Sequence, residues 1–274
     1  MAWANLVPRH NHWERSESYR HMNPTEKGAV SYFLGQVQAK LAAEQIFGIS
    51  TFAHYESYLE ALGRRTNSSR PDFIGFDNLA RTFVTVEAKG RFGKHPADHF
   101  VRTAKRQAQS VGLATTSATD YVYAQVAHFE TGQWAADLHD PPIVGTTTVP
   151  DRSAVAFAHY WPSVSAINLQ QSRSAEIAES MDTDAFTNTR SAFFPEGGFR
   201  IGVPEEIAAA VTSAADRLRS GKRYERGVVF PEWDEITSQR VDTDGDLDIG
   251  DPVSNPQLSV GNDRIVCILT ATRQ

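Results

Sequence analysis

The chain of 274 residues contains little of what marks several classes of protein. Its single cysteine, Cys267, excludes an internal disulfide framework and a zinc site built from cysteines. No run of apolar residues approaches the ~20 that a membrane-spanning helix needs, so we expect no membrane association. Residues 1–20 lack a basic segment followed by an apolar one, which predicts no secretory signal and a cytoplasmic location.

Several short enzyme motifs are also missing. The chain contains no Walker-A sequence, no G-x-S-x-G turn and no H-E-x-x-H motif, so ATPase, serine hydrolase and zinc protease chemistry have no support. The alternating aspartates of 242–248 resemble a calcium loop. That loop needs glycine at its sixth position and glutamate at its twelfth, where this chain has Leu247 and Val253. We therefore interpret the segment as an acidic turn.

Charge is present in both signs but is unevenly spread. The formal net charge is −6, which argues against a protein that binds nucleic acid over its whole surface. Residues 89–106 are mainly basic, whereas residues 232–251 are mainly acidic. A local basic segment on an acidic protein suits a site that holds one polyanion in one place, although charge clustering by itself more often marks a solvated face.

Hydrophobic periodicity predicts a mixed α/β core that follows a polar arm at 1–24. Thr25 is the expected N-cap of the first helix, in which Val30, Phe33, Leu34, Val37, Leu41 and Ala42 share one face. In chain order the expected elements are a helix at 26–47, a strand at 51–55, a short helix at 56–62, hairpin strands at 72–76 and 82–89, a helix at 97–111 and a strand at 121–127. This order predicts a mixed central sheet flanked by helices.

The remaining chain is harder to interpret. We expect strands at 153–160, 227–230 and 265–269 and a helix at 205–219. The predicted organisation is an arm at 1–24, a core at 25–135 and a C-terminal α+β elaboration at 136–274. We expect the elaboration to pack on the core as one globular unit.

The residues with recognisable chemistry lie in the predicted hairpin. Side chains alternate along a strand, so Glu87 and Lys89 project from one face, opposite to Ala88. The hairpin brings Asp72, at the start of its first strand, to the same end of the sheet. Two carboxylates and the carbonyl of Ala88 form an all-oxygen site for a hard cation such as Mg²⁺, with Mn²⁺ as an alternative. The ammonium of Lys89 would orient a water or stabilise developing negative charge.

This segment resembles the PD-(D/E)xK nuclease superfamily, which has the restriction-endonuclease-like fold. The resemblance rests on Pro71-Asp72, a spacer of hairpin length, and Glu87-Ala88-Lys89 after an apolar strand. It covers residues 25–127, somewhat under half of the chain. It implies that Asp72 and Glu87 are metal ligands and that Lys89 is the catalytic lysine.

The resemblance also implies roles on the two helices. The family carries a glutamate on its first core helix. Glu26 is narrowly preferred over Glu44 for this role. An equally good interpretation of Glu26 is a negative charge that stabilises the N-terminus of the helix. On the second helix, polar residues are placed roughly as in exonuclease-like members, but the tyrosine that such members often carry is absent. The expected DNA-contacting residues are Arg91, Lys94, Arg102, Lys105, Arg106 and Gln107.

Together these features predict a Mg²⁺-dependent deoxyribonuclease that acts in genome defence, restriction or repair. The alternative is a nuclease-fold module that binds nucleic acid or a protein partner without cutting, and an RNase or toxin-like nuclease is a third hypothesis. DNA is the expected partner, and both a homodimer and a subunit of a defence complex are compatible with the sequence.

Overall fold

The computed structural model describes most of the chain and divides it into two compact units. The first unit comprises residues 1–60 and 64–151, and the second comprises residues 61–63 and 152–274. None of the described helices combines the length and the apolar character needed to cross a membrane. The described residues are 5–64, 70–77, 82–93, 96–110, 121–140, 150–173, 188–220, 257–260, 263 and 265–269.

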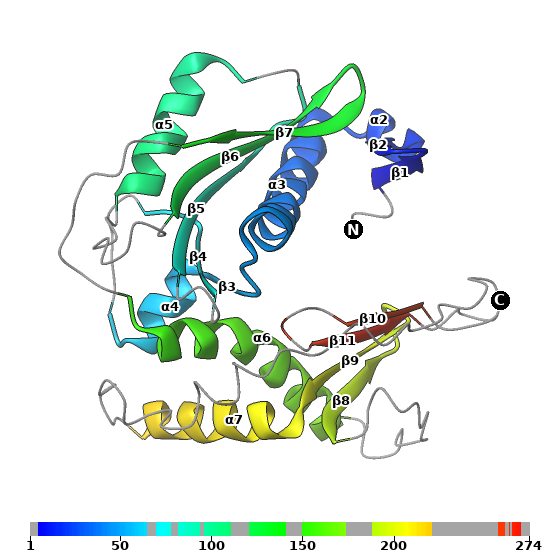
Figure 1. The fold of residues 1–274 in the computed structure, drawn as a ribbon. Coiled ribbons are helices and arrows are strands. Elements are labelled where there is room, and N and C mark those ends of the chain that lie inside the picture. Colours follow the sequence, from blue (N-terminus) through cyan, green and yellow to red (C-terminus); the bar gives the residue numbers. More distant parts are fainter. Residues whose placement is uncertain are drawn as a thin grey trace. The chain divides into compact units, whose positions relative to one another are not determined.

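The first unit is built on a seven-stranded sheet with the order β1-β2-β7-β6-β5-β4-β3 (Figure 1). Its strands are β1 Leu6–Arg9, β2 His12–Arg15, β3 Thr51–His54, β4 Phe73–Asp77, β5 Thr82–Gly90, β6 Tyr121–Glu130 and β7 Gln133–His139. β5 and β6 pair in parallel, whereas the other neighbours are antiparallel. The predicted mixed sheet and its central hairpin are therefore confirmed.

Helices cover both faces of this sheet. Figure 1 shows α3 on one face and α5 on the other. The helices of the first unit are α2 Glu17–His21, α3 Pro24–Phe47, α4 Tyr55–Ala61 and α5 Asp98–Gln109. The mixed α/β architecture expected from the sequence is thus present in this unit.

The N-terminus of α3 is held by a capping box. The side chain of Asn23 accepts a hydrogen bond from the backbone N–H of Glu26, and the carboxylate of Glu26 accepts one from the N–H of Asn23. The predicted N-cap, Thr25, was wrong because Pro24 already occupies the first helical turn, which proline favours.

The face that α3 turns to the sheet also differs from the predicted one. Its buried residues are mostly small, whereas Phe33 is 47% exposed. A Cβ atom at Gly35 would lie 2.9 Å from the nitrogen of Gly90, and one at Gly90 would lie 1.7 Å from the carbonyl oxygen of Ser31. Small residues let the helix backbone approach β5 closely, and this close approach overrides the larger apolar side chains. The residues of the predicted apolar face that are exposed are Phe33, Val37 and Leu41.

Regular structure extends into the segment expected to be a polar arm. β2 pairs with β7 through Glu14 and Gln133. The ring of Tyr19 is fully buried, 5.1 Å from the ring of Phe129, and its hydroxyl lies 2.7 Å from that of Ser31. Short strands at a sheet edge alternate too little for their pattern to be visible in the sequence.

The second unit has an antiparallel sheet with the order β10-β11-β9-β8, accompanied by two helices. The strand predicted at 153–160 was wrong, because this segment begins α6. Residues 154–160 are all buried, and a helix that is apolar all round cannot be told from a buried strand by its pattern. The strand predicted at 227–230 lies outside the described residues. The elements are α6 Arg152–Arg173, β8 Thr189–Phe194, β9 Phe199–Pro204, α7 Glu205–Arg219, β10 Gln257–Val260 and β11 Val266–Leu269.

Candidate active site

The hairpin of β4 and β5 brings Asp72 and Glu87 to the same end of the sheet. Phe73 pairs with Val86 in the antiparallel register, so Asp72, one residue earlier, lies level with Glu87. The Asp72 carboxylate accepts a hydrogen bond of 2.9 Å from the backbone N–H of Ala88 through its Oδ2 atom. The expected convergence at this sheet end is confirmed, while the chemical roles of the two carboxylates stay a prediction.

Alternation along β5 separates the core residues from the charged pair. Val84, Val86 and Ala88 belong to the apolar core that includes residues of α3. Glu87 and Lys89 project from the opposite face and form an ion pair. The side chain of Glu87 is 1% exposed, whereas that of Lys89 is 26% exposed. The carboxylate is therefore buried, and the lysine reaches from it toward the surface.

The electrostatic state of the two carboxylates reflects this burial. Burial and then the charge of Asp72 raise the pKa of Glu87 to about 7, with the hydrogen bond and charge of Lys89 opposing the shift. Burial also raises the pKa of Asp72, against the lowering effects of the Ala88 N–H and the Lys89 charge. Two acids that share a poorly hydrated site resist ionising together. The ammonium of Lys89, in its ion pair with Glu87, offsets part of this repulsion.

Asp72 opens into a pocket of about 510 Å³. α3, β3, α4 and α5 all contribute to its wall. At the wall, the guanidinium of Arg70 lies 2.9 Å from the carboxylate of Glu56. The lining residues are Tyr32, His54, Glu56, Ser57, Glu60, Arg70, Pro71, Asp72 and Gln107. Asp72 is thus accessible from the pocket.

The predicted DNA-contacting residues have different surroundings. Gln107 lines the pocket. Arg102 and Arg106 are exposed on α5, and Lys105 is partly buried there. The guanidinium of Arg91 lies 4.6 Å from the centre of the Phe100 ring, a cation–π contact. Lys94 lies outside the described residues.

The two candidate glutamates of the first core helix do not line the pocket. The carboxylate of Glu26 is exposed and is bonded to the N–H of Asn23, 2.8 Å away, in the capping box. Glu44 lies in the last turns of α3, far along the helix from Glu26. At the pocket wall the residue from α3 is Tyr32, so the structure favours the helix-stabilising interpretation of Glu26.

His54 and Tyr32 are among the pocket residues that were missed from the sequence. His54 pairs with Phe73 across β3 and β4, which places it beside Asp72. Burial lowers the pKa of His54, opposed by the charges of Asp72 and Glu56. The sequence would have indicated His54 if the strand at 51–55 had been paired with the first strand of the hairpin. Tyr32 gave no signal, because an aromatic residue in a helix is usually part of the core.

The donor set fits a hard divalent cation that brings further ligands of its own. Within the described ranges, no group of three or more His, Cys, Asp or Glu side chains is arranged to hold a metal ion. Mg²⁺ is commonly bound by one or two carboxylates, with waters and substrate phosphate completing its shell. Asp72, Glu87 and the carbonyl of Ala88 would provide such an incomplete set. The buried Glu87 carboxylate, level with Asp72 at the end of the hairpin, is the observation that favours a cation there.

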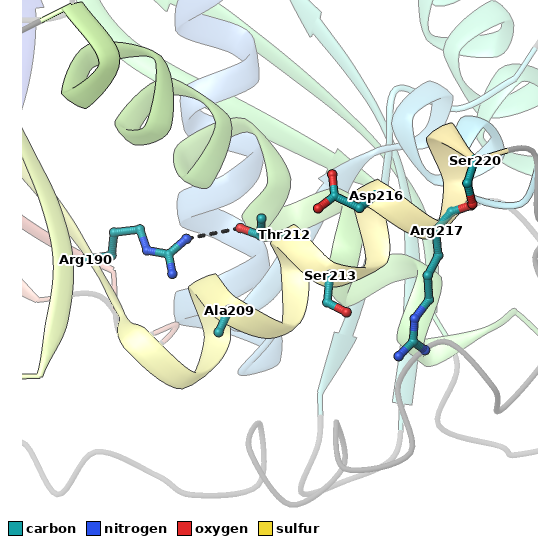
Figure 2. A pocket seen from close by; sticks show the side chains of 7 residues that line it. All are labelled: Arg190, Ala209, Thr212, Ser213, Asp216, Arg217 and Ser220. Carbon is teal, nitrogen blue, oxygen red and sulfur yellow. Dashed lines mark hydrogen bonds between the residues drawn. The ribbon is translucent and has the colours of Figure 1, made fainter.

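A second pocket, of about 530 Å³, lies in the second unit along α7. Figure 2 shows Arg190 directed toward Thr212, with Asp216 and Arg217 further along the helix. The guanidinium of Arg190 donates to the Thr212 hydroxyl over 3.1 Å and to the carboxylate of Glu205 over 3.2 Å. Its charge is balanced within the unit, so we assign this pocket no chemical role.

The chain was also compared with known proteins. No family model, no curated protein and no solved structure matches it.

Proposed function

We propose that the chain is a divalent-metal-dependent nuclease that hydrolyses phosphodiester bonds in DNA, with a site like that of the PD-(D/E)xK superfamily. One observation carries the proposal. The Asp72 carboxylate is bonded to the N–H of Ala88, the residue between Glu87 and Lys89, at the wall of an open pocket. An aspartate at the pocket wall thus lies beside the strand end that carries the buried glutamate and the lysine, and a phosphodiester would approach them from this pocket.

Each group has a role that follows from its chemistry. Asp72, Glu87 and the carbonyl of Ala88 would hold Mg²⁺ or Mn²⁺. When bound, such a cation polarises a phosphoryl oxygen and lowers the pKa of a water ligand. The Nζ atom of Lys89 lies beside Glu87, where it would orient the attacking water or donate to charge that develops on the phosphate.

The surface of α5 supports binding of a polyanion near this site. Arg102 and Arg106 are exposed on the helix whose Gln107 lines the pocket. Because the whole chain carries a net charge of −6, attraction to DNA has to come from such a local basic surface. Genome defence, restriction or repair is the setting that such an activity suits. The enzyme would act there as a homodimer or as a subunit of a defence complex.

A cleavage assay tests the proposal directly. The protein is incubated with single-stranded, duplex and branched DNA and with RNA, in Mg²⁺ or in EDTA. We expect DNA cleavage in Mg²⁺ alone. Binding of DNA without cleavage of any substrate would instead assign the chain to the alternative class of binding modules, and cleavage of RNA alone would assign it to the RNases.

A substitution of Lys89 gives the most direct test of the catalytic role proposed for this lysine. Lys89→Ala should lower the cleavage rate by about 10²-fold or more, as expected when a donor to developing charge is removed. Its fold should persist, because the side chain is outside the apolar core. The control is Lys27→Ala, on α3 and outside the pocket. Unchanged cleavage by Lys89→Ala would show that the lysine has no catalytic role.

A further inference from the structure

Two neighbouring aromatic side chains of α3 are exposed. Tyr32 is 49% exposed and Phe33 is 47% exposed, while Ser31, Leu34 and Gly35 are buried on the sheet side of the helix. The two rings contact each other edge to face, with their centres 5.5 Å apart. The two rings therefore form one exposed aromatic pair on α3.

Tyr32 lies at the candidate active site. It lines the same pocket as Asp72 and Gln107. Burial and then the charge of Asp72 raise the pKa of its hydroxyl, and the charges of Lys89 and Glu87 also act on it. The hydroxyl is therefore neutral at physiological pH, and the side chain offers an uncharged aromatic face.

The backbone that carries Tyr32 is fixed against β5. A Cβ atom at Gly90 would lie 1.7 Å from the carbonyl oxygen of Ser31 and 3.0 Å from the nitrogen of Tyr32. Such close contact leaves the helix little freedom to slide along the strand. The backbone of Tyr32 is thus held beside Gly90, the neighbour of Lys89, which favours binding because little backbone order has to be gained.

We propose that Tyr32 stacks on an unpaired nucleobase beside the scissile phosphate, so that the substrate is single-stranded or locally unpaired DNA. This inference rests on the proposed nuclease function. Inside a duplex, each base is stacked between its neighbours and offers no free face to a protein ring. A ring in the pocket that contains Asp72 meets a base face only where the strand is unpaired. Stacking on aromatic side chains is how proteins commonly bind single strands.

Binding without cleavage tests this inference. The full chain is titrated in EDTA against three fluorescent DNAs, a single strand, a blunt duplex of the same length and a duplex with a short single-stranded flap. Tyr32→Ala and Tyr32→Leu should weaken binding of the single strand and the flap by about 5- to 150-fold. Tyr32→Phe keeps the ring and should bind within about twofold of the wild type, and so should the control Val37→Ala, which changes an exposed apolar residue of the same helix outside the pocket.

The outcomes separate this inference from the proposed function. Equal affinity of Tyr32→Leu and wild type for the single strand would overturn the stacking role. Equal losses on the blunt duplex and the single strand would overturn it too, and so would a wild type that binds only duplex. Failure of the wild type to cleave any DNA in Mg²⁺ contradicts the nuclease proposal instead. A selective loss of single-strand binding in Tyr32→Leu would even then support the stacking site.

Discussion

Burial of one carboxylate sets the pH behaviour of the candidate site. The pKa of Glu87 is raised to about 7, above its ordinary value of 4.5. The folded protein therefore binds this proton more tightly than the unfolded chain does. The stabilising effect is complete below about pH 4.5 and is lost as the pH rises through about 7.

A glutamine at this position should therefore stabilise the protein when metal is absent. At pH 8, Glu87→Gln removes a buried charge, so we expect the free energy of unfolding to rise by on the order of 2–3 kcal/mol. At pH 4 the change should be small, because Glu87 is already protonated. Urea unfolding in EDTA at both pH values measures this difference. The control Glu130→Gln, at the exposed end of β6, should have little effect. Destabilisation at pH 8 would contradict the assigned burial.

The same proton competes with a bound cation. Because a carboxylate must lose its proton to bind metal, the affinity for Mg²⁺ should increase as the pH rises through about 7. Isothermal titration calorimetry from pH 5.5 to 8.5 measures this dependence. Both Asp72→Asn and Glu87→Gln should lose most of the Mg²⁺ affinity. An affinity that stays flat between pH 6 and 8 would exclude Glu87 as a ligand.

Gly28 and Gly35 both lie in α3, but the space around their Cα atoms differs. A Cβ atom at Gly35 would lie 2.9 Å from the nitrogen of Gly90, whereas one at Gly28 would have nothing within 4 Å. Gly35→Ala should therefore destabilise the protein by about 1–3 kcal/mol through overpacking. Gly28→Ala should stabilise it by about 1 kcal/mol through helix propensity. Thermal unfolding of both variants tests the close packing of α3 on β5, and equal effects would argue against it.

The exposed side of α5 is the element we expect to hold phosphates. Ala104 and Ala108 are its buried residues, so replacing Arg102, Lys105 and Arg106 together by glutamine should leave the fold intact. Each lost phosphate contact lowers the slope of log affinity against log salt by about 0.7 on a single strand and about 0.9 on a duplex. We therefore expect the slope to flatten by about 2 to 3 and the affinity to fall for all sequences alike.

Binding titrations between 50 and 300 mM salt measure that slope. The control replaces Arg217 and Arg219 on α7, in the second unit, and should leave the slope unchanged. A triple variant that loses only its sequence preference would show that these residues contact bases. A triple variant with unchanged affinity and slope would place the DNA elsewhere, for example at Arg64 or Arg70.

At the scale of the whole molecule, the candidate site belongs to one unit. Every residue that lines its pocket, from Tyr32 to Gln107, lies in the first unit, which ends at Asp151. The second unit has its own sheet and helices. The core predicted from the sequence ends at residue 135, inside β7, a strand that the sequence pattern did not indicate. The acidic stretch 232–251 lies outside the described residues.

Local patterns were enough for the centre of the first unit. The apolar alternation of 82–89 and the short spacer before it predict β4, β5 and their pairing, because neighbouring strands with a short connection pair with each other. The same alternation predicts that Glu87 and Lys89 share a face. The convergence of Asp72 with this pair follows from the register alone. For this reason the candidate site was visible before the fold was known.

Contacts between distant segments decided the rest. The buried face of α3 depends on the fit of Gly35 against Gly90, and such a fit leaves no periodic signal. β2 joins the sheet by pairing with β7, more than a hundred residues away, and the edge strand β1 pairs with β2. The burial that shifts the pKa of Glu87 and the position of Tyr32 in the pocket are likewise properties of the packed unit. A hydrophobicity pattern indicates which side chains are apolar enough to be buried. Close packing in the folded unit determines which of these side chains contact each other.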